Sequence, residues 1–408
     1  MRIAFLTPEY VSEPKFDGGL ANYLYRVTRA LGEAGHESEI FVAAEGDGTV
    51  SWAGVQVHRC RVAGLGARLH RFQRRILGRG WLSYMDTLQT AHALAARFKQ
   101  RHAEMPFDVV EASNFKATGL FVAPRSPTVV TRISYDPQSW TTQNGGRVDL
   151  DKALMCRLHD YAVRKSAAAY GPCARLAEQI GARLGHGIAV IHPPLFLPVE
   201  STREDASVWQ ERLSGHRYVL FFGRICRLKG ADILARAMRP ILAAHPELRL
   251  VLVGRPENTA YLGEVISCLG DGAESLIHIG RLPHAQLFPI VRQAECVVLP
   301  SRADNFPNAC IEAMGLGQTV IGTRRTGFED LIEHGANGFL FDAERVDELT
   351  GLIRSVLGRP PEDRRRIAER ARQRIAESDC RQATEKLVQF YSRAIGCAEG
   401  LVEAPTHA

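Results

Sequence analysis

Short apolar runs alternate with segments of helical periodicity along the whole chain. A run that is apolar throughout, and not only at every second residue, is typical of a parallel strand with helices on both faces. Such runs occur at residues 2–7, 38–44, 55–60, 107–113, 127–133, 167–172 and 188–193, and again at 218–223, 248–254, 276–280, 296–301, 319–323 and 338–342. The pattern predicts an α/β protein built from doubly wound parallel sheets.

The two series of strands are separated by a polar segment without a convincing strand, which we interpret as a linker. Two Rossmann-like domains are therefore expected to face a cleft at the carboxyl ends of their strands, where such sheets bind ligands. A last helix has no strand after it and is expected to cross back to the first domain. The predicted parts are a first domain at 1–195, a linker at 196–217, a second domain at 218–378, the returning helix at 379–395 and a tail at 396–408.

Composition narrows the class of protein. The 408 residues, 45% hydrophobic and 24% charged, describe two globular domains, neither disordered nor membrane-spanning. No apolar run approaches the ~18 residues of a spanning helix, and residues 1–10 are too weakly apolar for a signal peptide. The nine cysteines are scattered and form no C-x-x-C pair, which favours reduced thiols in a cytoplasm over a zinc ribbon or a disulfide scaffold.

A glycine pair, Gly18 and Gly19, precedes the first helical segment, in which Leu20, Leu24 and Val27 recur at helical spacing. Because the pair follows the first strand, it would let the backbone approach a ligand while the N–H groups of the helix start face an anion. A tight strand-to-helix turn is the alternative interpretation.

Two cations, Arg224 and Lys229, lie five residues apart after the first strand of the second half, and Gly223 precedes them. On such a loop both side chains can converge on one polyanion while glycine keeps the backbone close. A solvated basic turn is the alternative. The position favours a ligand, because the carboxyl end of the first strand in a doubly wound sheet is where one is expected.

Two acids lie on either side of a helix start. Asp304 falls in a loop after a strand, and Glu312 falls inside a helix that is predicted to open at Pro307 and to end at about Gly315 or Gly317. A carboxylate suits paired sugar hydroxyls, because each oxygen can accept a hydrogen bond. The alternative is a helix acid favoured by the macrodipole together with an ordinary surface acid.

Two further segments have competing interpretations. Residues 65–82 place leucine, phenylalanine and isoleucine on one helical face and five arginines on the other, which suits an anionic membrane surface or a helix packed on its own domain. No recognisable nucleic-acid-binding module accompanies this charge. The triplet from Asp149 to Asp151 has the spacing of a metal-binding D-x-D motif, but its place before a helix favours a cap.

Taken together, these segments resemble the retaining glycosyltransferases of family four, which have the GT-B fold. The first half matches loosely, through residues 16–31 and 132–137, and the resemblance covers about residues 1–395. In the second half the matching motifs, in the family's order and spacing, are residues 221–230, 245–254, 276–287, 301–323 and 327–342. The resemblance implies two Rossmann-like doubly wound parallel-sheet domains facing a cleft.

The resemblance also implies an activity. A sugar would pass from a nucleotide-sugar donor to a hydroxyl group of a carbohydrate, lipid-linked or small-molecule acceptor, with retention, in glycan, polysaccharide, glycolipid or glycoside biosynthesis. The nucleotide sugar is then a substrate, and neither a cofactor nor a metal is expected. The expected location is the cytoplasm, with peripheral contact at the inner face of the membrane through residues 65–82. A nucleotide-sugar epimerase on the same fold and a non-catalytic nucleotide-sugar binder are the alternatives.

Individual roles follow from the family motifs. Arg224 and Lys229 match the pair that holds the donor diphosphate and neutralises the leaving group. Glu312 matches the second acid of the family's E-x7-E motif, which binds the donor ribose, and Asp304 occupies the place of the first acid, assigned to the transferred sugar. The other expected donor contacts are Gly18, Gly19, Gly223, Asn305 and Phe306.

The chain departs from the family at two places. The first acid is usually Glu, whereas Asp304 is shorter by one methylene, roughly one bond length of reach. Ser134 stands where many members have a histidine, so a sugar contact through Ser134 or Tyr135 would involve no imidazole. An epimerase would need acid–base residues in the first domain, for which the candidates are Glu9, Asp17 and Glu111.

Overall fold

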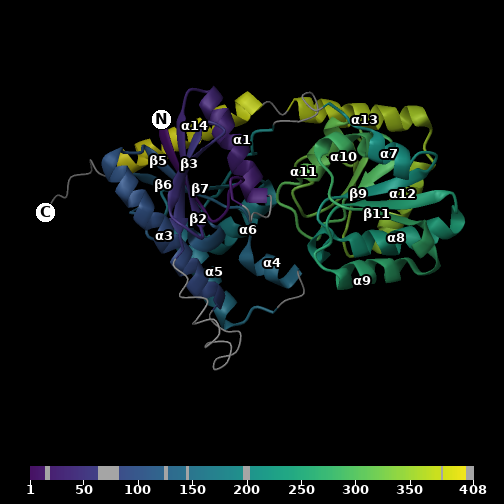
Figure 1. Cartoon of the computed structure of the whole chain (residues 1–408), viewed down its shortest axis with the longest axis horizontal. Coiled ribbons are helices and arrows are strands. Elements are labelled where there is room, and N and C mark those ends of the chain that lie inside the picture. The colour runs from purple at the N-terminus through teal and green to yellow at the C-terminus, as the bar shows by residue number, and fades with distance from the viewer. Residues whose placement is uncertain are drawn as a thin grey trace. The chain divides into compact units, whose positions relative to one another are not determined.

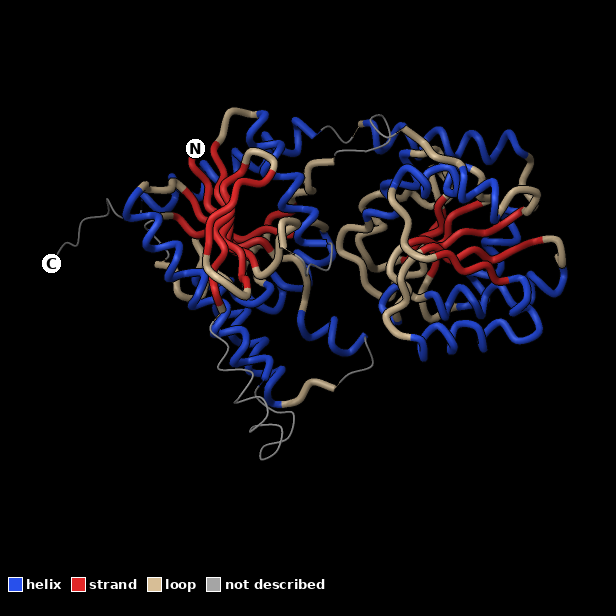
Figure 2. Tube along the Cα trace, viewed as in Figure 1, coloured by secondary structure: helices blue, strands red, loops and turns tan. Residues whose placement is uncertain are grey.

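The structure is a computed structural model of the 408-residue chain. It describes residues 1–13, 19–62, 82–123, 127–143, 147–195, 203–377 and 380–400. The chain divides into two compact units, the first made of Met1–Leu195 with Asp379–Ala408 and the second of Phe196–Ser378. Each unit has a central, mainly parallel sheet with helices around it, as Figure 1 and Figure 2 show. The predicted α/β class with two parallel sheets is confirmed.

The sheet of the first unit has the strand order β3-β4-β2-β1-β5-β6-β7-β8. Its strands are β1 (Arg2–Thr7), β2 (Glu37–Ala44), β3 (Gly48–Trp52), β4 (Val55–Arg61), β5 (Val109–Ser113), β6 (Thr128–Arg132), β7 (Ala168–Gly171) and β8 (Ala189–Val190). All neighbouring pairs are parallel except β3 with β4. The apolar runs predicted every strand but β3, an edge strand whose residues are mostly exposed.

Helices cover both faces of this sheet. They are α1 (Gly19–Glu33), α3 (Leu82–Glu104), η1 (Phe115–Ala117), α4 (Pro137–Gln143), α5 (Leu150–Lys165), α6 (Ala174–Leu184) and α14 (Cys380–Gly400). One face packs against the buried side chains of α1, among them Leu24 and Val27, and against Leu387 and Tyr391 of α14. The other face packs against Leu94, Ala95 and Phe98 of α3.

Helix α14 is anchored in the first unit by a buried carboxylate. Glu111 on β5 is 3% exposed and accepts hydrogen bonds from the hydroxyl groups of Tyr23 (3.3 Å), Tyr170 (2.6 Å) and Tyr391. Burial raises the pKa of Glu111, although the tyrosine hydrogen bonds oppose the rise. The guanidinium of Arg132 lies 3.5 Å from the centre of the Tyr23 ring, a cation–π contact within the same cluster. The cluster joins residues far apart in the sequence into one core.

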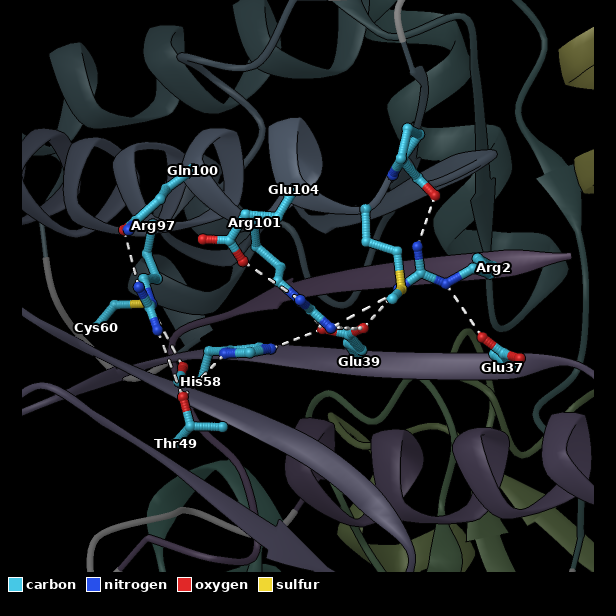
Figure 3. A network of polar contacts seen from close by, with 12 residues as sticks. Arg2, Glu37, Glu39, Thr49, His58, Cys60, Arg97, Gln100, Arg101 and Glu104 are labelled. Atoms are coloured by element: carbon cyan, nitrogen blue, oxygen red, sulfur yellow. Dashed lines mark hydrogen bonds and ion pairs between the residues drawn. The ribbon is translucent and has the colours of Figure 1, made fainter.

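A second polar network joins α3 to the sheet around Glu39 of β2 (Figure 3). Its carboxylate receives Arg2 Nη2 at 2.7 Å, Arg101 Nε and Nη2 at 3.0 and 3.1 Å, and faces His58 Nε2 at 2.7 Å. Burial of Glu39 would raise its pKa, but the hydrogen bonds from His58 and Arg101 outweigh burial and lower the pKa to about 2. The ionised carboxylate is therefore stabilised by folding.

We expect Glu39→Gln to lower the free energy of unfolding by about 2–3 kcal/mol at pH 7. The folded pKa, about 2, lies below the ordinary value of 4.5. The contribution of this group is therefore fully present above about pH 4.5 and is lost as the pH falls toward 2. Urea unfolding between pH 7 and pH 3 should show the gap between wild type and variant narrowing below pH 4.5.

The matched control is Glu37→Gln, because Glu37 also pairs with Arg2 but its side chain is 75% exposed. We expect that change to alter the unfolding free energy by less than about 0.5 kcal/mol. Equal unfolding free energies for wild type and Glu39→Gln at pH 7 would contradict the stabilising role of the network.

The sheet of the second unit is parallel throughout, with the strand order β11-β10-β9-β12-β13-β14. Its strands are β9 (Arg217–Phe222), β10 (Leu248–Val253), β11 (Leu276–Ile279), β12 (Cys296–Val298), β13 (Val320–Thr323) and β14 (Phe339–Phe341). Its helices are α7 (Ser207–Arg212), η3 (Arg227–Lys229), α8 (Ala231–Ala244), α9 (Thr259–Leu269), η4 (Gly270–Ser275), α10 (His284–Arg292), α11 (Asn308–Gly315), α12 (Val346–Leu357) and α13 (Pro361–Ala376). All the predicted strands are present.

Helix α7 lies inside the segment that we interpreted as a linker, for which the sequence indicated no strand. Just before it, Asp205 accepts a hydrogen bond from Gln286 Nε2 of α10 at 2.9 Å, and Glu204 pairs with Arg292 at 2.9 Å. Part of the polar segment therefore packs on the second unit through polar contacts, which a search for apolar runs does not detect.

The order of the strands fixes where a ligand can approach the second sheet. The chain runs outward from β9 through β10 to β11, and then returns to the other side of β9 for β12, β13 and β14. The helices that follow β9 and β12 therefore lie on opposite faces of the sheet, and sheets of this kind bind ligands at such a switch point. Both of the charged motifs predicted from the sequence lie on the loops after these two strands.

Candidate functional site

Glycines bring the loop after β9 against the end of β12. Gly223 has a φ of +128°, and Gly230 a φ of +73°, in the region that favours glycine. A Cβ atom at Gly230 would lie 2.0 Å from the carbonyl oxygen of Pro300, which follows β12. No other residue would allow this approach without moving the backbone, so the close contact between the two loops depends on Gly230.

An ion pair with a buried aspartate helps to hold the same two loops together. Arg302, after β12, donates through its backbone N to Leu228 O at 2.8 Å, and through Nη1 to Arg227 O at 2.6 Å. Its guanidinium also binds both carboxylate oxygens of Asp232, at 2.7 and 2.6 Å, and Asp232 is 1% exposed. Burial would raise the pKa of Asp232, but the hydrogen bonds from Arg302 and Tyr261 lower it. Sequence reasoning missed this pair, since no motif signals it.

The predicted cation and the predicted acid are in contact. Lys229 Nζ donates to Asp304 Oδ2 at 2.5 Å, with 29% and 12% of the two side chains exposed. Arg224 is exposed near the start of the loop that carries Lys229. The backbone oxygen of Asp304 accepts a hydrogen bond from Gly327 N at 2.6 Å, which fixes the loop from its other side. The structure thus joins the two motifs into one charged site.

The helix predicted to open at Pro307 is α11, Asn308–Gly315, and this prediction is confirmed. Glu312 lies inside α11 with 13% of its side chain exposed, and its Oε1 lies 3.6 Å from His284 Nε2. Asn305 and Phe306 are partly buried in the loop between Asp304 and the helix. The loop after β12 and helix α11 therefore carry Asp304, the loop amides and Glu312 in sequence.

The predicted residues of the first unit lie at the starts of α1 and α4. Gly19 is the first residue of α1 and is exposed, whereas Gly18 lies outside the described residues. Ser134 donates through N and Oγ to Asn114 Oδ1 at 2.8 and 3.0 Å, and Asn114 Nδ2 donates to Tyr135 O at 2.7 Å. Asn114 follows β5 and was not predicted. It holds the segment at the end of β6 in place.

The side chain of Tyr135 packs inward. Its ring meets the rings of Phe115 and His159 edge-on, with centroids 5.3 and 5.9 Å apart, and burial raises the pKa of its hydroxyl group. Next to Phe115, the backbone is strained: Lys116 and Ala117 have φ values of +63° and +44°. Strain of this kind at the end of a central strand is common at functional sites.

Both aspartates of the D-x-D triplet cap helices. Asp149 accepts a hydrogen bond from Lys152 N at 2.9 Å at the start of α5, which confirms the predicted cap. Asp151 accepts from Ser83 N and Tyr84 N at 3.0 and 2.9 Å and so caps α3. In the described part of the chain, no group of three or more His, Cys, Asp or Glu side chains is placed to hold a metal ion.

The acids that an epimerase would use have other contacts. Glu9 Oε1 accepts a hydrogen bond from Ala21 N, 3.4 Å away, near the start of α1, and Glu111 lies in the buried tyrosine cluster. Asp17 lies outside the described residues. The contacts of Glu9 and Glu111 are those of structural groups and give no support to acid–base chemistry on a sugar.

The basic segment was predicted to contact a membrane or its own domain. Residues 65–81 lie outside the described residues, and only Leu82, at the start of α3, is placed. The membrane contact therefore stays a prediction. Among the helices that the structure describes, none is long and apolar enough to cross a bilayer.

Two families of known sequences match this chain. Residues 204–374 match the family described as "Glycosyl transferases group 1", and residues 18–194 match the "Glycosyl transferase 4-like domain". The first match contains the charged site of the second unit, from Arg224 to Glu312. The second contains the segments of Gly18, Gly19, Ser134 and Tyr135.

Curated relatives are similar over part of the chain. A D-inositol 3-phosphate glycosyltransferase 1 from Catenulispora acidiphila is 32% identical over 193 residues, which is 45% of this chain and 45% of the relative. A D-inositol 3-phosphate glycosyltransferase from Segniliparus rotundus is 31% identical over 145 residues, 35% of this chain and 32% of the relative. The matched segments thus span between about a third and just under half of these relatives' length.

Solved structures share the fold over nearly the whole chain. Sucrose-phosphate synthase from Thermosynechococcus elongatus is 18% identical with a TM-score of 0.77, covering 97% of this chain and 99% of that one. Anabaena Alr3699/HepE, solved in complex with UDP, is 17% identical with a TM-score of 0.70, covering 96% and 100%. At these identities the likeness establishes the fold.

Proposed function

Since this chain belongs to the group 1 glycosyltransferases of family four and has their GT-B fold, we propose that it transfers a sugar from a nucleoside-diphosphate sugar to a hydroxyl group, with retention of configuration. The observation that carries the proposal is the contact of Lys229, on the loop after β9, with Asp304, on the loop after β12. Glu312 follows Asp304 at the spacing of the family's paired acids.

The chemistry requires charge stabilisation more than a protein nucleophile. The bond between the anomeric carbon and the donor phosphate breaks, and the acceptor oxygen bonds to the same face of that carbon. The leaving phosphate accepts the acceptor's proton. Negative charge grows on the diphosphate as it leaves, and we propose that Arg224 and Lys229 on the loop after β9 neutralise that charge. The site's main contribution is then position and electrostatics.

Each of the other polar groups has a role in this proposal. Glu312 binds the ribose hydroxyls of the donor, because its two oxygens can each accept one hydrogen bond. Asp304 faces the transferred sugar, and the amides of Asn305 and Phe306 lie beside the sugar or phosphate. Gly19 leaves the start of α1 accessible to the phosphates or the acceptor. We propose that neither a metal nor a cofactor takes part, because two cations and backbone amides suffice for the diphosphate charge.

The experiment is a thermal-shift panel of UDP, GDP, ADP and dTDP with their common sugar conjugates. A ligand of the folded state present at about 100 times its Kd stabilises the protein by about 2.7 kcal/mol, so the right nucleotide should raise Tm by several degrees. Glu312→Gln should lose most of that rise. If no nucleotide raises the Tm of the wild-type protein, the proposed donor class is wrong.

The donor identified by this panel is then used to find the acceptor. With the identified donor, transfer is assayed by release of the nucleoside diphosphate in the presence of candidate acceptors. Inositol phosphate comes first, because it appears in the names of the curated relatives, followed by simple sugars and lipid-linked sugars. Acceptor-dependent release distinguishes a transferase from an epimerase, which forms no free nucleotide, and from a non-catalytic binder, which turns over neither substrate.

A further inference from the structure

His284, the first residue of α10, was given no role by the sequence motifs. Its ring stacks on that of Phe288, one turn further along the helix, with centroids 5.1 Å apart and planes inclined by 23°. Phe288 has no exposed surface and belongs to the packed side of α10. The orientation of the imidazole is therefore restrained by a rigid neighbour, even though 48% of the His284 side chain is exposed.

The restrained ring faces the acid at the site. His284 Nε2 lies 3.6 Å from Glu312 Oε1, and the Glu312 side chain is only 13% exposed. The two residues come from helices on either side of β12, α10 before it and α11 after it, both labelled in Figure 1. A polar ring edge 3.6 Å from the carboxylate restricts the positions that a flexible glutamate side chain can take.

We propose that His284 is a positioning residue that holds the Glu312 carboxylate in the orientation needed for a ribose diol, and that it thereby sets a preference for ribonucleotides over 2′-deoxyribonucleotides. The proposal rests on the proposed function, in which Glu312 binds the donor ribose. A carboxylate binds a diol with both oxygens only when its plane is correctly placed. The His284 ring, 3.6 Å from Glu312 Oε1, provides that placement before the nucleotide arrives.

We expect loss of His284 to reduce the preference for ribonucleotides over 2′-deoxyribonucleotides more than it reduces nucleotide affinity in general. A site arranged to hydrogen-bond a hydroxyl group rejects the analogue that lacks it, because the polar group of the protein is then left without its partner. Loss of the His284 ring would let Glu312 adopt several rotamers. The second hydrogen bond to the diol would weaken, while binding of the 2′-deoxy analogue, which offers one hydroxyl group to the carboxylate, would change little.

The test is calorimetric titration of the full chain with UDP, GDP and ADP and with their 2′-deoxy analogues. For the nucleotide that binds best, we expect His284→Ala to weaken ribonucleotide binding by about tenfold and 2′-deoxy binding by less than about twofold. His284→Gln, which keeps a side-chain N–H donor, should recover most of the preference. With saturating donor sugar, kcat of His284→Ala should stay within about twofold of wild type while KM rises.

The control is His245→Ala, since His245 is another exposed histidine of this unit, 52% exposed and 3.4 Å from Glu247. It should leave both titrations unchanged. Equal weakening of ribo and deoxy binding by His284→Ala, or no weakening of either, would overturn the role of His284. If Glu312→Gln leaves ribonucleotide binding intact, the proposed ribose site itself is wrong, and that result is distinct from a failure confined to His284.

Discussion

Replacing Lys229 by alanine is expected to lower kcat/KM of the proposed transfer by about 10²–10³-fold, with most of the loss in kcat. The ammonium group lies at the carboxyl end of the first strand of its sheet and contacts the acid of the facing loop. A cation fixed there before the reaction stabilises the charge that develops on the leaving diphosphate more than it stabilises the bound donor. Arg224→Ala on the same loop should act in the same direction.

The change should leave the fold intact. The Lys229 side chain is 29% exposed and lies on a short turn, η3, whose close contact with β12 depends on Gly230 and on the Arg302–Asp232 pair. The measurement is steady-state kinetics with the donor found by the thermal-shift panel, together with Tm of the variant.

A matched control lies two residues away. Arg227 is on the same turn but pairs with Glu264 of α9 at 2.7 Å, and both side chains are more than 40% exposed. We expect Arg227→Ala to keep kcat/KM within about twofold of wild type, because an exposed pair of this kind contributes little. Near-normal activity of Lys229→Ala would exclude Lys229 from the donor site.

The fold could be predicted from the sequence wherever burial is continuous. The central strands are the clearest apolar runs, and β1, β5, β6 and β9 are buried along nearly their whole length. Strand β3 has a neighbour on one side only and exposes most of its residues, so it left no such run. Helix α7 left no apolar run either, because none of its residues is buried.

The sequence named the residues of the candidate site, but it did not show which of them are in contact. The positions of charged residues after predicted strands, together with the resemblance to family four, pointed to Lys229, Asp304 and Glu312. Their contacts were not visible, because Lys229 and Asp304 are 75 residues apart in sequence and meet only through the neighbouring positions of β9 and β12 in the sheet. The same reason hid the Arg302–Asp232 pair and the approach of His284 to Glu312.

Changes at Asp304 should reveal whether this acid acts alone or through Lys229. With Oδ2 held at 2.5 Å from the ammonium group, Asp304 fixes the position of the cation. We expect Asp304→Asn to lower kcat/KM by about 30-fold or more, because Lys229 then loses its charged partner. Asp304→Glu keeps the charge but moves the carboxylate by about 1.5 Å, and a displacement of that size at a reacting centre is expected to lower kcat by about tenfold or more.

A double-mutant cycle separates the two possible roles. If Asp304 works mainly by holding the ammonium group, its contribution is already lost in Lys229→Ala. Adding Asp304→Asn to that variant should then lower kcat/KM by less than about threefold more. If Asp304 acts on the transferred sugar independently of Lys229, the two losses should multiply. The contact seen between the side chains favours the first result. The aspartate in place of the family's usual glutamate would then be matched to Lys229, its shorter side chain ending where the ammonium group must stay when the diphosphate leaves.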